Sequence, residues 1–275
     1  MNTAEPVGRS LRRPARPTAL VVALLLAVAV IVTLVVTGTH GGHVGPPGPG
    51  GVGLGAPAGP GDGDGDGDAG TFTDVRAGDA DLVVLDGVSG RIQVTADADA
   101  HTVTGSFHRG DGVPARIRSA VTGATGRRVL TFGCQDPGGA VTPCAGDLAL
   151  TVPEHTGLRL RQTSGETVLT RLGGDLTVAT ASDRFTAQGL HPSRADVTVT
   201  SGSADLGFAD PPDALTVRAT SAAMTLRLPS DAAGGYAVTT AATSADVQVQ
   251  VPRRADAAHH VSLQVLSGSL AVLPA

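Results

Sequence analysis

The stretch that decides the fold is residues 194–228, RADVTVTSGSADLGFADPPDALTVRATSAAMTLRL, in which one phrase occurs twice. An alternating run of β-favouring residues leads into Thr-Ser, a small residue follows, and a second alternating run begins. The Ser of this phrase recurs along the chain at Ser89, Ser164, Ser182, Ser201, Ser221, Ser244 and Ser267. A period of about 20 residues, with two short strands and a tight turn per unit, is typical of stacked β units. The sequence therefore predicts an all-β chain, a β-solenoid similar to a single-stranded β-helix.

The apolar residues keep one phase relative to each Ser. With the Ser as position 0, positions −6, −4 and −2 are mostly apolar, and the apolar set resumes at +3, +5 and +7, as at Val197, Val199 and Leu206. Side chains alternate faces along a strand, so this set is predicted to point inward and the intervening Thr, Arg and Gln outward. The copy at Ser164 is less regular because Gln162 and Arg171 occupy inward positions. A bulge, an early end of the coil or a different register would each explain that.

The residues after each Ser indicate sharp corners. Gly follows the Ser at Gly90, Gly165, Gly202 and Gly268, where a corner often needs a positive φ. Asp or Ala stands there in the other copies, which predicts a different type of turn at the Ala corners. In a parallel stack the Ser and Thr hydroxyls would form a column hydrogen-bonded along the axis. We interpret the serines as structural, because a nucleophile would have to differ from its repeats.

The N-terminal residues predict a membrane location. Residues 18–37, TALVVALLLAVAVIVTLVVT, are apolar and uncharged, and as a helix they would span about 30 Å, the thickness of a bilayer core. The run is preceded by arginines, and the next basic residue is Arg76, so residues 1–17 are predicted to be a cytoplasmic tail and the C-terminal part to be extracytoplasmic. The prediction is a single-pass protein of the cell membrane. A cleaved signal peptide is the alternative.

Residues 38–70 form a linker rich in Gly and Pro that ends in GDGDGDGD. Such a composition predicts a disordered tether between the membrane and an ectodomain of residues 71–275. The alternating Asp residues resemble the start of a calcium loop. However, the twelfth position is Thr73 rather than Glu, which favours a solvated acidic spacer.

The only two cysteines are Cys134 and Cys144. In an oxidising compartment a close pair most often forms a disulfide, which here would bridge a loop rich in turn residues. A metal or redox pair is the alternative, but the spacing is wrong for one and no third ligand lies nearby in the sequence.

The sequence offers little catalytic machinery. It has no Lys, no zinc-protease spacing among its eight His residues, and no Gly-x-Ser-x-Gly elbow. We therefore predict a protein that is not an enzyme, with no catalytic, cofactor-binding or metal-binding residues and no cofactor. The net charge of −5 and the scattered basic residues give no basis for nucleic-acid binding.

The repeated phrase, together with VPEHTGLRLRQTSGETVL and LTVRATSAAMTLRLP, resembles the DUF4097 family of bacterial "putative adhesins". The resemblance covers residues 72–273 and implies strand repeats behind one transmembrane helix. It implies no catalytic residues. The chain departs from the family pattern at Ser182, Ser221 and Ser244, where the next residue is not Gly.

Three functions are open at this point. The first is a non-enzymatic, adhesin-like or protein-interaction module of the cell envelope, whose partner is an unknown envelope protein or glycan. The second is an envelope-sensing protein that regulates through a partner, and the third is a glycan-active β-helix enzyme. Residues 102–153 lack the Ser phrase. The gap from Ser89 to Ser164 would hold about four coils at the later spacing, and the alternative is a looser sheet region that caps the N-terminal end.

Overall fold

The computed structural model describes residues 71–109, 115–122, 126–135, 141–230, 232 and 234–275. Every regular element in these ranges is a β-strand, which confirms the all-β prediction. The predicted tail, transmembrane helix and linker lie outside the described residues. Within the described ranges, no helix is long and apolar enough to cross a membrane.

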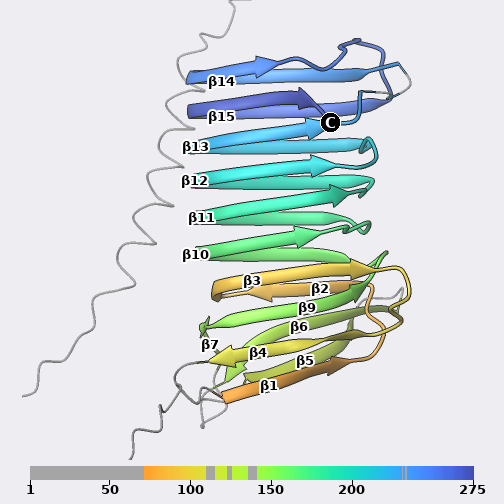
Figure 1. Ribbon diagram of the computed structural model, residues 1–275, viewed down its shortest axis with the longest axis vertical. Helices are drawn as coiled ribbons and strands as arrows, with labels where there is room; N and C mark the ends of the chain where they lie inside the picture. Colours follow the sequence, from red (N-terminus) through yellow and green to blue (C-terminus); the bar gives the residue numbers. More distant parts are fainter. Residues whose placement is uncertain (1–70, 110–114, 123–125, 136–140, 231, 233) are drawn as a thin grey trace, which may run out of the picture. The chain divides into compact units, whose positions relative to one another are not determined.

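Six long strands form the regular part of the molecule, and they stack in parallel (Figure 1). Their Ser residues are in register from strand to strand. The buried positions change phase at each Ser: in β12, Val197 and Val199 are buried before it, and Ala204 and Leu206 after it. Each strand is therefore one bent coil, with a first arm before the Ser and a second arm after it. The six are β10 (Gly157–Thr170), β11 (Leu176–Leu190), β12 (Arg194–Phe208), β13 (Ala214–Leu228), β14 (Tyr236–Val249) and β15 (His259–Pro274).

The order of the coils in space departs from their order in the chain at the C-terminal end. Strand β15 lies between β13 and β14, and β14 is the last strand of the stack. Two inward positions of β15 hold Leu263 and Val265, which are buried, whereas the matching positions of β14 hold Thr240 and Ala242, which are exposed. Burying the more apolar coil removes more apolar surface from water, which favours this order.

Two further coils lie below β10, and each is assembled from more than one strand. Strands β2 (Leu82–Asp86) and β3 (Val88–Asp97) are the two arms of the coil at Ser89, and both pair in parallel with β10. Strand β6 (Arg127–Gln135) pairs in parallel with β2, while β8 (Cys144–Ala145) and β9 (Asp147–Pro153) pair with β3. Strands β6, β8 and β9 thus complete an interrupted coil that carries no Ser phrase.

An antiparallel region covers the N-terminal end of the stack. Strand β4 (Val103–Arg109) pairs with β9, and β1 (Thr71–Ala77) pairs with β4. Strands β5 (Ala115–Thr122) and β7 (Val141–Thr142) pair with β6. Of the two alternatives for residues 102–153, the looser capping region is therefore the observed one, combined with the single interrupted coil.

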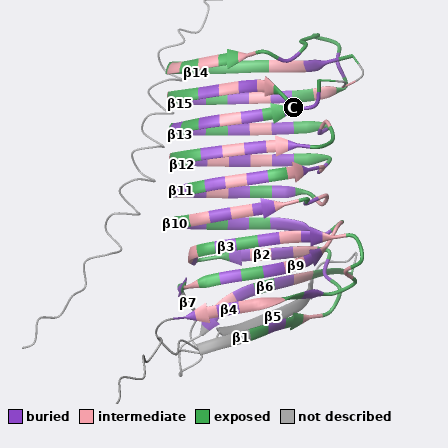
Figure 2. Cartoon of the chain, viewed as in Figure 1, coloured by how far each residue is buried: buried purple, intermediate pink, exposed green. Residues whose placement is uncertain are grey.

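The core is the narrow space between the two arms. The predicted inward residues from position −6 to position +5 are buried in the copies at Ser182, Ser201, Ser221 and Ser267, whereas at position +7 Gly189 is only partly buried and Pro274 is exposed. Strand β14 is the exception, because much of its length is exposed (Figure 2). Small aliphatic side chains fill most of the core. Two rings meet near the capped end, where Phe107 of β4 lies edge to face against Phe132 of β6 at 5.1 Å between centroids.

The irregular copy at Ser164 ends early. Strand β10 stops at Thr170, and Arg171 is exposed with a φ of 57°. The pairing of β10 with β11 runs in register on both sides of the Ser, so the register of the copy is the predicted one. An early coil end thus accounts for Arg171, whereas Gln162 does point inward and is buried.

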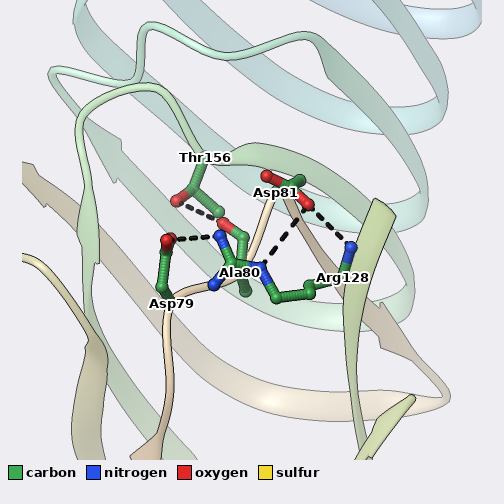
Figure 3. A network of polar contacts seen from close by, with 5 residues as sticks. All are labelled: Asp79, Ala80, Asp81, Arg128 and Thr156. Carbon is green, nitrogen blue, oxygen red and sulfur yellow. Dashed lines mark hydrogen bonds and ion pairs between the residues drawn. The ribbon is translucent and has the colours of Figure 1, made fainter. Parts of the chain in front are cut away.

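Polar contacts join the three lowest coils where they begin (Figure 3). Arg128 of β6 forms an ion pair with Asp79, and its backbone N–H donates to Asp81 Oδ2 at 2.6 Å. Thr156, just before β10, donates its hydroxyl to the carbonyl of Ala80 at 3.0 Å. The starts of β2, β6 and β10 lie far apart in the chain. These contacts therefore fix the alignment of strands that belong to different coils.

Candidate interaction surface

The corner residues named from the sequence lie at the bends of the coils, where most of them stack along one edge. They are Ser89, Gly90, Ser164, Gly165, Ser182, Ser201, Gly202, Ser221, Ser244, Ser267 and Gly268. The serines make different contacts: Ser182 and Ser201 are 3.0 Å apart between Oγ atoms, while Ser201 donates to the carbonyl of Ala181 at 2.7 Å. Ser267 donates to the carbonyl of Thr220, also at 2.7 Å. Hydroxyl-to-hydroxyl bonding along the axis, as predicted, is thus seen between Ser182 and Ser201, while Ser201 and Ser267 also donate to the backbone of the neighbouring coil.

The corners are of two types, as the sequence predicted for Ala. All four Ser-Gly corners have a positive φ at Gly, and Asp183, Ala222 and Ala245 do not. At Gly202 the φ is 104°, and a Cβ there would lie 2.2 Å from the carbonyl oxygen of Asp183. Only Gly fits this corner, since a side chain would meet both backbone strain and the adjacent coil.

From β10 to β14 the two types alternate in space. The order is Gly165, Asp183, Gly202, Ala222, Gly268 and Ala245, read along the stack rather than along the chain. If β14 lay directly on β13, two Ala corners would be neighbours. The position of β15 therefore keeps the alternation unbroken.

A disulfide stands where the interrupted coil has no continuous corner. Cys134 ends the first arm in β6, and Cys144 begins the second arm in β8. Their Cα atoms are 5.4 Å apart, and both residues are buried. The bond joins the two arms of one coil across an insertion of nine residues, from 135 to 143.

A small polar cluster lies inside the stack where β10 meets β11. Gln162 donates its amide N–H groups to the carbonyls of Gly90 at 2.9 Å and Ser164 at 3.1 Å, which turns its Oε1 toward the hydroxyl of Thr167. Thr167 Oγ1 also lies 2.9 Å from Asp183 Oδ2. All three side chains are buried.

The one hydroxyl hydrogen of Thr167 has two possible acceptors in this cluster, Gln162 Oε1 and Asp183 Oδ2. Burial, as the leading cause, raises the pKa of the Asp183 carboxyl above its ordinary value; the charge of Glu166 acts in the same direction, while the Thr167 hydrogen bond opposes it.

The outer faces of the two arms carry ion pairs between neighbouring coils. Arg218 Nη1 of β13 lies 2.8 Å from Asp196 Oδ1 of β12 on the first-arm face. On the second-arm face, Arg227 of β13 pairs with Asp205 of β12. These side chains are about half exposed, so each pair contributes little to stability, and the charges are neutralised along the stack.

A trough of about 480 Å³ runs over the outer face of the second arms, across β11, β12, β13, β15 and β14. Its floor is made of the short side chains at position +2, which are Ser203, Ala223 and Ser269. Arg184 lies at one end and Asp246 at the other. Five strands give the trough a length of about 19 Å.

The trough supplies hydroxyl, amide and carboxylate groups along an open path. Thr186, Asp205, Thr225 and Gln248, at position +4, form one wall. Such a surface can hydrogen-bond an extended polar chain that lies along the stack axis. In the sequence, the trough corresponds to a small residue at position +2 of three coils. This feature is harder to recognise than the corners because it forms no motif.

Among the described residues, we find no further cluster of titratable groups that forms a site. His191 Nε2 lies 3.0 Å from Glu154 Oε1 in a loop contact. Over the ranges that the structure covers, no group of three His, Cys, Asp or Glu residues is placed to hold a metal ion.

No family model matches the sequence, and no curated protein matches it. The DUF4097 resemblance therefore stays a prediction.

Three solved structures are similar to the chain in fold. A "putative cell adhesion protein" from Clostridium sporogenes is 10% identical, with 75% of this chain and 100% of that one covered and a TM-score of 0.48. A "putative adhesin" from Bacteroides fragilis is 15% identical over 74% of this chain and 96% of that one, with a TM-score of 0.34. Another "putative adhesin", from Parabacteroides merdae, is 9% identical over 74% of this chain and 95% of that one, with a TM-score of 0.28. Since all these values are low, we argue the function from the chain's own surface.

Proposed function

We propose that the chain is a non-enzymatic, adhesin-like module of the bacterial cell envelope, a β-solenoid that binds an extended polar polymer along its second-arm face. The observation that carries the proposal is the trough, which crosses five coils in register. An extended polypeptide is the favoured ligand over a glycan, because no exposed aromatic ring lines the trough for a sugar to stack on.

The architecture supports a display role. A stack of coils joined by backbone hydrogen bonds holds short side chains in fixed rows, and one ion pair on each face joins β12 to β13. Binding by such a surface depends on many small polar contacts over a long path rather than on one activated group.

The test compares two substitutions in one strand. Ser269→Arg places a long side chain on the trough floor, and Ser262→Arg is the matched control on the outer side of the first arm of β15. Beads coated with the full-length chain are tested for retention on immobilised bacterial envelope. We expect retention for the unchanged chain and for Ser262→Arg, and at least a tenfold loss for Ser269→Arg.

Two outcomes would contradict this function. If Ser269→Arg and Ser262→Arg were retained equally, the trough would not be part of the binding surface. Release of soluble sugar from the envelope by the unchanged chain would favour the glycan-active enzyme.

The membrane anchor belongs to the same proposal and is tested separately. We expect the full-length chain to stay in the membrane fraction after alkaline carbonate extraction. Protease added outside intact cells should remove the C-terminal part. Release of the chain into the medium, with its N-terminus cut after the apolar run, would instead show a cleaved signal peptide.

A further inference from the structure

The last coil of the stack has an open edge. Strand β14 pairs with β15 on one side only, and apart from one bridge between Tyr236 and Arg253 no described segment pairs with its other edge. The opposite end of the sheet is covered by antiparallel strands. Exposed strand edges are usually protected by Pro, Lys, bulges or several charges. In contrast, residues 237–249 contain no Pro and one charge, Asp246.

The inward face of β14 is open to solvent as well. Thr240 and Ala242 are exposed, and Val247 and Val249 are only partly buried, although these positions face the core in every other long coil (Figure 2). A further strand on this edge would close the core and supply backbone partners. We propose that the occupant is the β14 strand of a second copy of this chain, paired antiparallel about a two-fold axis at the corner.

The positions of the inward residues make β14 complementary to itself. They lie at −4 and −2 on the first arm and at +3 and +5 on the second. A two-fold axis between Ser244 and Ala245 places Ala242 opposite Val247, and Thr240 opposite Val249, of the other copy. The two arms are exchanged by the axis, and the inward faces of both copies meet the same core. A shift of one residue would put inward side chains opposite outward ones.

The same register suits the charge. Asp246 of one copy lies opposite Thr243 of the other, whose hydroxyl can donate to the carboxylate. The outward pairs beyond it join Ala241 to Gln248, and no two like charges face each other. A two-fold interface is isologous, so this single register satisfies both copies at once.

The size of the contact predicts a reversible dimer. Arms of about seven residues are about 23 Å long, and two sheets with their outer side chains are about 20 Å thick. The end of the stack then contributes roughly 500 Å² per copy, or about 1,000 Å² in total, the lower limit for a specific interface.

The dimer would also orient the two molecules. β1 and β14 are at opposite ends of the sheet, so the two-fold axis points the β1 ends of the copies away from each other. If the chain is anchored by its N-terminal segment, which rests on the proposed function, the dimer joins copies on two facing membranes. The pairing itself requires no anchor, and its test is independent of membrane location.

The test is sedimentation velocity of the purified full-length chain in detergent solution, from 1 to 100 µM. Ala242→Asp puts a charge on the inward face that is exposed in the monomer and enclosed in the dimer. Ala241→Asp puts the same charge on the adjacent outward position, exposed in both. We expect a concentration-dependent dimer for the unchanged chain and Ala241→Asp, and at least tenfold weaker association for Ala242→Asp with an unchanged melting temperature. A monomer at 100 µM, or equal association of both variants, would overturn the proposal.

Cross-linking tests the register without relying on those variants. Thr243→Cys and Asp246→Cys chains each carry one new thiol, because both native cysteines are in a disulfide. Directly opposite residues in antiparallel strands have Cβ atoms about 5 Å apart, within reach of a disulfide. We expect a disulfide-linked dimer when the two variants are mixed. Cross-linking that is as fast within each variant alone, or absent from the mixture, would overturn the antiparallel pairing.

Discussion

The coils above and below β10 share a two-armed cross-section, but they are held together differently. From β10 upward, each coil is one continuous strand whose corner joins its two arms. Below β10, the interrupted coil takes its arms from β6 and from β8 and β9, and the bond between Cys134 and Cys144 stands in for the corner. A repeat can therefore lose its chain continuity and keep its place in the stack if a covalent link and its strand pairing remain.

The largest effect is expected at a Ser-Gly corner. Gly202→Ala should lower the free energy of unfolding by about 3 kcal/mol or more, because the added Cβ meets the carbonyl of Asp183 and the φ is positive. Urea unfolding measures the loss. The matched change at the other corner type, Ala222→Gly, should cost only about 1 kcal/mol. Equal losses would mean that the two corner types are not distinct.

Loss of the disulfide is expected to destabilise only the strands below β10. Replacing both Cys134 and Cys144 by Ala should cost about 2–3 kcal/mol, since the bond closes a short loop in the unfolded chain. Hydrogen exchange of the full-length variant should show faster exchange in β6 and β9 and unchanged rates in β12 and β13. Faster exchange throughout the stack would contradict the view that the two regions are held independently.

The buried acid where β10 meets β11 gives a pH dependence. The pKa of Asp183 is raised in the folded chain, so its contribution to stability is complete below the pKa of the unfolded chain and is lost as the pH rises toward the folded value. Asp183→Asn keeps a neutral side chain that can donate to Thr167. We expect thermal unfolding of the variant to show a smaller loss of stability between pH 4 and pH 8 than the unchanged chain. A steeper loss in the variant would show that Asp183 is ionised in the fold.

The smallest effect is expected for the ion pairs on the outer faces. A double-mutant cycle with Asp196→Ala and Arg218→Ala should give a coupling of about 0.5 kcal/mol, because both side chains are nearly half exposed. Urea unfolding in low and high salt measures it, and the coupling should shrink in high salt. A coupling above about 2 kcal/mol would show that these pairs, rather than corners and core, stabilise the upper coils.

The two regions also differ in how far the sequence predicts them. Above β10, the phase around each Ser identified inward residues such as Val217 and Leu226, which are buried, because one local rule repeats in each coil. The Ala corners were correctly assigned to a second turn type for the same reason. Below β10, Val129–Phe132 pairs with β2 and Leu148–Val152 with β3, but nothing local in the sequence shows that they are two arms of one coil.

The candidate site and the coil order were harder to predict. The trough depends on which outward residues become neighbours, and chain order alone would have put Ala223 beside Asp246, whereas Ser269 lies between them. Thr240 and Ala242 looked inward by phase, and they are, but their exposure follows from the place of β14 at the end. The place of β14 depends on whether β14 or β15 packs against β13. That choice depends on the composition of both coils and cannot be inferred from one repeat.

Cysteine pairs on the second-arm face test the coil order most directly. With β15 between β13 and β14, Ala223→Cys/Ser269→Cys and Asp246→Cys/Ser269→Cys each place two thiols on adjacent strands, about 4.8 Å apart. Ala223→Cys/Asp246→Cys places them two strands apart, at about 9.6 Å, beyond the reach of a disulfide. Mass spectrometry after mild oxidation should find intramolecular disulfides in the first two variants and free thiols in the third. Bonds in the second and third variants but not in the first would show that the coils follow chain order and would contradict the fold described here.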